Sequence, residues 1–199
     1  MTASTKVVAG LVARAQDAPA RLGPWPRAEC RLVCVDGPAG SGKTTLAAEL
    51  AEVLHAQVVH MDDLYEGWEA GPDGGAKRLR EWVLGPLAAG RTGRYLRYDW
   101  AAGAYAEEHT VSAAPFLVVE GCGAAARQVD PWAALRVWVE ADGAERLRRG
   151  LTRDGEQARE HWLRWMADEA EHFARERTRE RADVRLDGFG NLVPRGGRA

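Results

Sequence analysis

The stretch of sequence that decides the fold is Gly37-Pro38-Ala39-Gly40-Ser41-Gly42-Lys43-Thr44. It matches in full the pattern G-x-x-x-x-G-K-[ST] of a phosphate-binding loop, or P-loop. The apolar run Arg31–Asp36 before it predicts a buried strand, and residues 43–55 after it predict a helix. A strand, a glycine-rich turn and a helix in this order form the context in which the pattern binds phosphate groups.

Each residue type in this loop has a physical purpose. Glycines let the backbone wrap closely around a phosphate with its N–H groups pointing inward. Lys43 can reach the β- and γ-phosphates, and the hydroxyl of Thr44 can ligate magnesium. We therefore expect ATP and Mg²⁺ as cofactors. The expected nucleotide-binding residues are Gly37, Pro38, Ala39, Gly40, Ser41, Gly42, Lys43, Thr44 and Thr45.

The rest of the chain alternates short apolar runs with longer helical patterns. Such alternation predicts an α/β fold of the P-loop NTPase type, with a parallel sheet and helices on both of its faces. We also expect a helical lid after the fourth strand. Residues 67–75 are rich in glycine and predict a loop. The further predicted strands are 57–61, 116–120, 135–140 and 184–186, a hairpin is predicted over 95–100 and 105–111, and helices over 1–18, 76–87 and up to about 181.

Length and charge limit the organisation of the chain and its partners. The 199 residues fit one domain at 29–190, preceded by a helix and linker at 1–28 and followed by a flexible tail at 191–199. The formal net charge of -2 gives no general attraction to nucleic acid or to an anionic membrane. With no apolar run long enough to cross a bilayer, we expect a soluble, cytoplasmic protein whose partner is a small molecule. The sequence leaves its oligomeric state open.

The three cysteines are too few and too scattered for a disulfide framework. Cys30 and Cys34 flank a predicted strand, Cys122 follows another, and no second pair completes a zinc site. We expect buried free thiols and a reducing compartment.

Other classes of nucleotide-binding protein fit less well. A GTPase carries an Asn-Lys-x-Asp reader of guanine, but Asn191 in the tail is the sole asparagine of the sequence. The signature of ABC transporters is absent as well. A remodelling ATPase would need a strand ending in Asp-Glu and a larger domain.

Carboxylates follow two of the predicted strands. Asp62 and Asp63 come after the second strand, and Glu120 ends the strand 116–120. Ligands of a doubly wound sheet bind at the carboxyl ends of the strands. Phosphoryl transfer needs one carboxylate to orient the acceptor hydroxyl and take its proton, and another to hold magnesium. The alternative is that the aspartates cap a helix or turn and that Glu120 is a solvated strand end.

With these segments in place, the sequence resembles the uridine kinase family, within the nucleoside, pantothenate and phosphoribulose kinase group of P-loop kinases. The resemblance covers most of residues 31–187. It rests on GPAGSGKTT at 37–45, His60-Met61-Asp62-Asp63-Leu64-Tyr65, Tyr98-Asp99-Trp100, Val118-Val119-Glu120-Gly121, Arg148-Arg149-Gly150-Leu151-Thr152-Arg153-Asp154 and Ala182-Asp183.

The resemblance implies a role for several of these residues. Asp62 matches the family's catalytic aspartate, and Glu120 would assist magnesium. Arg149 and Arg153 fall where the family's lid supplies arginines to the phosphates; a solvated helix face is the alternative for both and for Arg148. The residues implied for the acceptor are Asp62, Tyr65, Tyr98, Asp99 and Trp100, with Asp73 as a partner of the ribose.

The predicted function is thus an ATP-dependent kinase, a phosphotransferase that acts on the hydroxyl group of a small molecule. The resemblance implies a nucleoside such as uridine or cytidine as one acceptor. A nucleoside monophosphate kinase, with Arg94 and Arg97 to anchor an acceptor phosphate, is the first alternative. A regulatory protein that binds ATP without catalysis is the second.

Overall fold

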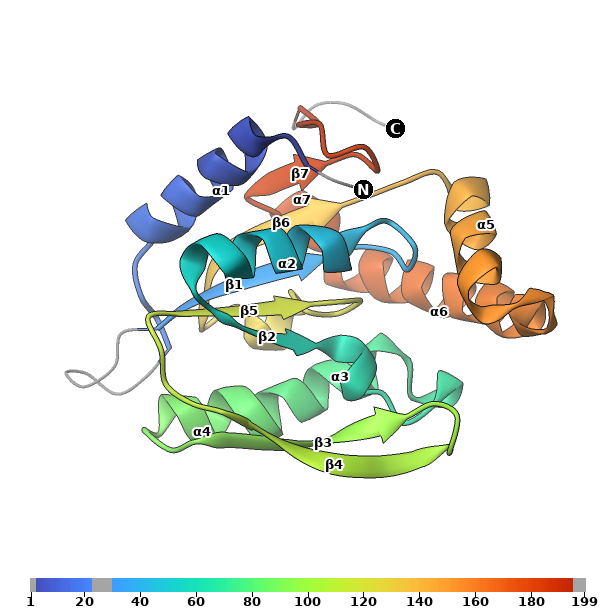
Figure 1. Ribbon diagram of the computed structural model, residues 1–199, viewed down its shortest axis with the longest axis horizontal. Helices are drawn as coiled ribbons and strands as arrows, with labels where there is room; N and C mark the ends of the chain where they lie inside the picture. The colour runs from blue at the N-terminus through green and yellow to red at the C-terminus, as the bar shows by residue number, and fades with distance from the viewer. Residues whose placement is uncertain (1–2, 23–29, 195–199) are drawn as a thin grey trace.

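A five-stranded parallel sheet in the order β2-β5-β1-β6-β7 forms the centre of the molecule (Figure 1). The computed structural model describes residues 3–22 and 30–194. Its strands are β1 (Arg31–Asp36), β2 (Gln57–His60), β5 (Phe116–Glu120), β6 (Ala133–Val139) and β7 (Val184–Leu186). This confirms the expected parallel α/β sheet with the P-loop after its central strand.

The side chains of β1 alternate between two hydrophobic cores. Leu32 and Cys34 face one side of the sheet, Val33 and Val35 face the other, and all four are fully buried. A strand that is covered on both faces has to be apolar at every position, and this is why the run was recognisable in the sequence.

Helices cover both faces of this sheet. On one face α1 (Thr5–Asp17) packs against α2 (Lys43–Leu54), and the apolar residues of both helices join the same core. The opposite face is covered by α3 (Gly71–Arg78), α4 (Gly85–Ala88), α6 (Arg159–Glu176) and the antiparallel hairpin of β3 (Gly93–Asp99) and β4 (Ala104–Val111). Figure 1 shows α5 (Gly143–Asp154) and α6 on the side toward which the strand arrows point, and α7 (Thr178–Arg181) beside β7.

The register of the sheet brings three strand ends together. His60 of β2 lies beside Glu120 of β5, and Glu120 lies beside Val35 of β1. The P-loop after β1, the turn after β2 and the end of β5 therefore meet at one edge. This edge is where the sequence analysis expected the ligands.

Two predicted elements differ from those observed. β2 ends at His60, and Met61–Asp63 forms a 3-10 turn in place of the last strand residue. The segment 67–75 is not all loop, because α3 begins at Gly71 and continues through a π-helical stretch, Leu79–Leu84, into α4. The glycine at position 75 is explained by packing, since a Cβ there would lie 2.5 Å from the ring of Tyr65.

The chain ends are only partly described. The predicted N-terminal helix is confirmed as α1, with Ser4 as its N-cap. Most of the predicted linker and the last five residues of the predicted tail, 195–199, lie outside the described residues. Leu192 pairs with Leu186, so the first part of the predicted tail is attached to the sheet.

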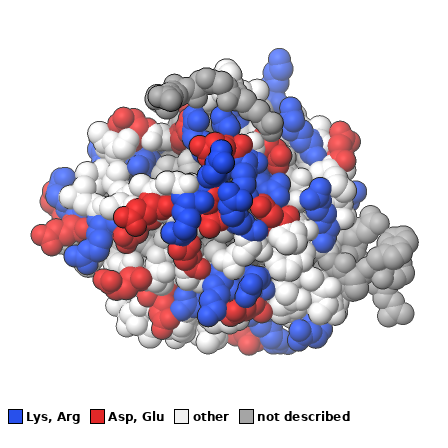
Figure 2. Space-filling model, turned by 180° about the vertical axis from the view of Figure 1, so that it is seen from behind, with Lys and Arg blue, Asp and Glu red and all other residues white. Residues whose placement is uncertain are grey.

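The surface and the cysteines agree with the composition. Basic and acidic side chains are intermixed on the face shown in Figure 2. Cys30, Cys34 and Cys122 are buried and free, and burial raises the pKa of the Cys30 thiol to about 11. Among the described helices, none is both long and apolar enough to cross a membrane.

Two helical glycines provide a matched test of the packing. A Cβ at Gly150 of α5 would lie 2.3 Å from the Trp162 ring of α6, whereas a Cβ at Gly10 of α1 would meet nothing within 4 Å. We expect Gly150→Ala to lower the free energy of unfolding by about 1–3 kcal/mol through overpacking. Gly10→Ala should raise it by about 0.5–1 kcal/mol because alanine loses less backbone entropy in a helix. Urea unfolding measures both, and equal stability of the two variants would contradict the described contact between α5 and α6.

Candidate active site

The P-loop connects β1 to α2, and three of its glycines, Gly37, Gly40 and Gly42, have a positive φ, which favours glycine. Gly37 has a φ of 142°, and a Cβ there would lie 2.0 Å from the carbonyl oxygen of Val139. Gly40 has a φ of 77°, and a Cβ there would lie 2.8 Å from the carbonyl oxygen of Arg146. Gly37 and Gly40 are therefore fixed by the neighbouring β6 and α5 as well as by the need to surround a phosphate.

A buried carboxylate anchors the start of the loop. Asp36 is 1% exposed and accepts the backbone N–H groups of Gly37, Gly123 and Ala125 at 2.7, 3.0 and 2.8 Å. Burial raises its pKa, and the N–H groups of Ala125 and Gly37 act in the opposite direction. The side chain ties the P-loop to the segment that follows β5.

Lys43 begins α2 and lies on the floor of the site. Its ammonium group donates to the carbonyl oxygen of Pro38 at 2.9 Å, and the residue is 6% exposed. Burial alone would lower the pKa of Lys43, but the surrounding acidic side chains, among them Glu120 and Glu169, raise it. The site thus holds a buried cation beside the P-loop amides.

Thr44 and Glu120 supply oxygen atoms that suit magnesium. The Thr44 hydroxyl donates to Oε1 of Glu120 at 3.1 Å, and Nδ1 of His60 lies 2.7 Å from the same oxygen. The hydrogen bond to Glu120 raises the pKa of His60. Hydroxyl and carboxylate oxygens are the ligands that hard cations such as Mg²⁺ prefer, so the donor set fits the expected metal. The sequence analysis did not predict a role for His60.

A cavity of about 1260 Å³ opens from the P-loop toward the hairpin. Its walls come from the P-loop, the turn after β2, the end of β5, the hairpin tip, α5 and α6. The predicted site residues along it are Ala39, Gly40, Gly42, Lys43, Thr44, Asp62, Asp63, Tyr65, Arg97, Tyr98, Trp100, Glu120, Arg149 and Arg153. The structure thus brings most of the predicted residues into one space.

Asp62 and Asp63 differ in their surroundings. Both residues line the cavity, but Asp62 is the more exposed of the two, and the carboxylate of Asp63 accepts the hydroxyl of Tyr95 at 3.4 Å. Asp62 is exposed to the space inside the cavity, but the cavity walls limit its solvation by bulk water. This loss of solvation raises the pKa of Asp62, and the charge of Glu120 acts in the same direction. Burial also raises the pKa of Asp63, opposed by the charge of His60.

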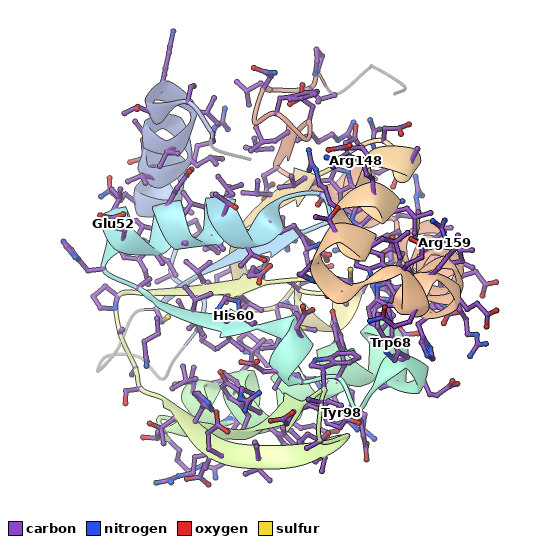
Figure 3. All side chains as sticks on the ribbon, turned by 45° about the vertical axis from the view of Figure 1, so that its right-hand side comes forward. Glu52, His60, Trp68, Tyr98, Arg148 and Arg159 are labelled. Carbon is purple, nitrogen blue, oxygen red and sulfur yellow. The ribbon has the colours of Figure 1, made fainter. Side chains whose placement is uncertain are left out.

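The arginines of α5 occupy different places. Arg149 donates to the carbonyl oxygen of Gly40 at 3.1 Å, so it lies against the P-loop. Arg153 pairs with Asp154 at 2.7 Å and lies over the ring of Trp162. Arg148 pairs with Glu145 and is largely exposed, on the outer part of α5 in Figure 3. All three arginines line the cavity, and Arg149 is the one of the three whose described hydrogen bond reaches the P-loop.

Aromatic rings form the wall of the cavity far from the P-loop. The centroid of the Trp68 ring lies 5.2 Å from that of Trp100 and 5.4 Å from that of His161, and Tyr98 lies 5.6 Å from Trp100. Trp100 is fixed by its indole N–H, which donates to the carbonyl oxygen of Asp62 at 3.1 Å. Trp68 and Tyr98 lie close together below α5 and α6 in Figure 3. We call Trp68, Tyr98, Trp100, His161 and Trp165 the aromatic wall.

Tyr65 connects this wall to the sheet. It is 1% exposed, and its hydroxyl donates to the carbonyl oxygen of Cys122 at 2.6 Å. Its ring packs 4.9 Å from that of Trp165. Only part of Tyr65 therefore faces the cavity, and its hydroxyl is already bonded to the backbone.

Three predicted polar residues have other partners. Asp73, expected beside a ribose, bonds His172 and Arg175 of α6 and does not line the cavity. Asp99 accepts the N–H groups of Ala101 and Ala102, so it shapes the hairpin turn. Arg94 pairs with Glu108 across the hairpin. The structure does not bring Asp73 to the cavity, because α3 begins at Gly71 and this side chain bonds α6.

Two further charged residues that sequence reasoning missed reach the P-loop. Glu169 of α6 accepts the N–H of Ala39 at 2.8 Å. Arg146 of α5 lies 2.5 Å from Glu169 and donates to the carbonyl oxygen of Ala39 at 3.2 Å. A signal for Glu169 was present in the sequence, because it follows the helical spacing of Trp162, Trp165 and Phe173. A carboxylate on such an apolar helix face is expected to be buried and therefore to need a partner.

The fold and the P-loop define a nucleotide-binding protein with the architecture of P-loop kinases. An AAA domain family matches residues 33–173, and the chain belongs to this family. This family membership and the described sheet confirm the P-loop fold that the resemblance implied. No curated protein matches the sequence.

Solved structures of small-molecule kinases share this architecture. A possible uridine kinase from Bacillus stearothermophilus superimposes with a TM-score of 0.65 and 20% identity, over 92% of this chain and 98% of its own. A candidate fructose transport system kinase from Silicibacter sp. gives 0.62 and 20%, over 84% and 94%. D-glycerate 3-kinase from Cryptococcus neoformans gives 0.59 and 14%, over 95% and 96%. At these identities the likeness establishes the fold.

The position of Lys43 yields the first test of the site. Lys43→Ala should weaken the binding of Mg-ATP by about 10- to 100-fold, because charge-assisted hydrogen bonds to the phosphates are lost. Isothermal titration calorimetry measures the affinity, and Lys77→Ala, which removes an exposed lysine of α3, is the matched control. Wild-type affinity in a folded Lys43→Ala protein would disprove the P-loop assignment.

Proposed function

We propose that the chain is an ATP-dependent kinase that transfers the γ-phosphoryl group of Mg-ATP to a hydroxyl group of a small molecule. The observation that carries this proposal is the shared cavity, which is lined by the P-loop and Lys43, by Asp62 and by the aromatic wall. A nucleotide and an acceptor fit into one enclosed space in this arrangement. That is what direct transfer between them requires.

The proposed reaction assigns one step to each group. Asp62 accepts the proton of the acceptor hydroxyl as its oxygen bonds to the γ-phosphorus, while the bond from that phosphorus to the bridging oxygen breaks and ADP leaves. Lys43 and the P-loop amides stabilise the charge that develops on the transferred group. Magnesium, held by Thr44 and Glu120, would neutralise charge on the β- and γ-phosphates.

The raised pKa of Asp62 suits a general base. A carboxylate whose pKa lies above its ordinary value binds a proton more readily, as a general base has to. The loss of solvation inside the cavity is the main cause of this shift, and the charge of Glu120 adds to it. Asp63 has part of its accepting capacity occupied by Tyr95, which favours Asp62 for this role.

The acceptor end favours an uncharged molecule with an apolar or planar part. Arg97, the cation nearest to the aromatic wall among the predicted anchors, is held by Glu107 at 2.6 Å and by Asp99 at 3.5 Å. Arg94 is likewise paired on the hairpin. An acceptor phosphate would have to break these pairs, so a hydroxyl compound such as a nucleoside fits better than a nucleoside monophosphate. Stacking on Trp68 or Trp100 would bind its ring.

A screen for ADP release tests the proposal and identifies the acceptor. Wild-type protein with Mg-ATP is incubated with nucleosides, nucleoside monophosphates, sugars and vitamin precursors. We expect ADP release to depend on a hydroxyl acceptor, and phosphorylated product to appear by mass spectrometry. Release that is insensitive to every acceptor, or the lack of any release despite ATP binding, would favour the regulatory alternative.

Asp62 and Asp63 can then be separated with the acceptor found. Asp62→Asn keeps the shape and removes the basicity, so turnover should fall by about 10²- to 10⁴-fold with little change in ATP affinity. Asp63→Asn, the matched control, should be far milder because its carboxylate bonds Tyr95. A larger loss of kcat in Asp63→Asn would reverse the assignment of the base.

The arginines of α5 provide another test of the proposed transfer. Arg149→Ala and Arg153→Ala should lower kcat more than they raise the KM for ATP, because the proposed contacts strengthen in the transition state. Arg159→Ala is the control, since Arg159 is an exposed, paired arginine that does not line the cavity. Near-normal kcat in both α5 variants would show that these residues form a solvated helix face.

A further inference from the structure

Glu169 is a charged residue in the interior of the molecule, and all its described partners lie at or beside the P-loop. It is 1% exposed. One of its oxygens accepts the backbone N–H of Ala39 at 2.8 Å and the thiol of Cys122 at 3.3 Å, and the other lies 2.5 Å from the guanidinium group of Arg146. A carboxylate is costly to bury and is tolerated only with such partners.

Glu169 and Arg146 lie on two different helices and both form a hydrogen bond to the same P-loop residue, Ala39. Glu169 on α6 takes the N–H of Ala39, and Arg146 on α5 donates to its carbonyl oxygen at 3.2 Å. The next residue, Gly40, approaches the backbone of α5 so closely that a Cβ would lie 2.8 Å from the carbonyl oxygen of Arg146. The tip of the P-loop is thus fixed to both helices, and a shift of Ala39 would move Glu169 with it.

The same helix reaches the far end of the cavity. Trp165 precedes Glu169 by four residues, one helical turn, so the two side chains lie on the same face of α6. His161 is one turn further back, and it stacks on Trp68. One rigid helix therefore carries a P-loop contact and two members of the aromatic wall.

We propose that Glu169 and Arg146 are positioning residues that couple occupancy of the P-loop by nucleotide to the position of the aromatic wall. This inference rests on the proposed function, because the aromatic wall is taken there as the acceptor side of the site. Neither residue touches the reacting atoms in this scheme. Phosphates draw the P-loop amides toward themselves, the peptide at Ala39 follows, and α6 transmits the shift to Trp165 and His161.

Such coupling has a thermodynamic consequence. If nucleotide binding moves the aromatic wall, it changes the affinity for the acceptor by some factor. Acceptor binding then has to change the affinity for the nucleotide by the same factor. The ion pair is suited to this because a charge-assisted hydrogen bond in an interior of low dielectric constant is stronger and more directional than one between neutral groups.

The test uses Mg-ADP as the probe and needs no acceptor. Calorimetry gives the affinity of the wild-type protein for Mg-ADP. The change of tryptophan emission at saturating Mg-ADP reports a change in the position of the aromatic wall. The variants are Glu169→Gln, which keeps an oxygen for Ala39 but removes the charge that faces Arg146, and Trp165→Phe, which identifies the reporting ring. Glu140→Gln is the matched control, because Glu140 pairs with Arg179 at 2.6 Å and does not line the cavity.

We expect Mg-ADP to change the emission of the wild-type protein, and Trp165→Phe to remove most of this change. Glu169→Gln should reduce the amplitude at saturation to less than half, whereas Glu140→Gln should leave it unaltered. A full amplitude in Glu169→Gln at saturation overturns the coupling, whatever the affinity. Nucleotide binding by wild-type protein without a change of emission, or a full change that persists in Trp165→Phe, also overturns it.

The stability of the buried pair requires a second variant. Removing one partner leaves the other charge unpaired, so Glu169→Gln could unfold the chain. The double variant Glu169→Gln with Arg146→Gln removes both charges together, and it should show the same loss of amplitude. A wild-type protein that binds no nucleotide contradicts the proposed function itself, whereas binding with an intact amplitude in the folded double variant contradicts only the coupling.

Discussion

The carboxylate of Asp36 is the fixed point on which the site depends. It ends the central strand in the interior and receives backbone N–H groups from the P-loop and from the segment after β5. Because the donors come from segments 87 and 89 residues away as well as from its neighbour, it holds Gly37 and the Cys122 region in one geometry. Asp36, the P-loop and the segment after β5 thus form one frame. Lys43, Glu120 and Tyr65 are each attached to the P-loop or to the end of β5, so this frame sets their mutual positions.

Much of this frame was predictable from local sequence. A strand buried on both faces is a continuous apolar run, so β1, β5 and β7 were predicted with the observed bounds. The P-loop pattern is likewise local. The site residues Asp62, Glu120 and Arg149 followed from strand ends and from the family resemblance, and the structure places all three around the cavity.

The remainder depends on contacts between distant residues. Ala39 and Glu169 are separated by 130 positions, and Asp73 and His172 by 99, so no pattern within a window could link them. The start of α3 was missed because glycine favours loops locally, while packing against Tyr65 makes a glycine necessary in the helix. Tertiary contacts overrode propensity at that position.

Trp162, Trp165 and Glu169 of α6 show that one side chain can belong to the core and to the site at the same time. Trp162 and Trp165 are 2% and 5% exposed, as core residues are, and they still line the cavity because the remaining surface faces it. Glu169 lies on the same helix, one turn after Trp165, and reaches the P-loop. A rigid core helix supplies both wall and anchor, because a ring held by packing keeps its orientation and loses little entropy when a ligand stacks on it. The aromatic residues of α6 therefore contribute to the site through their packing.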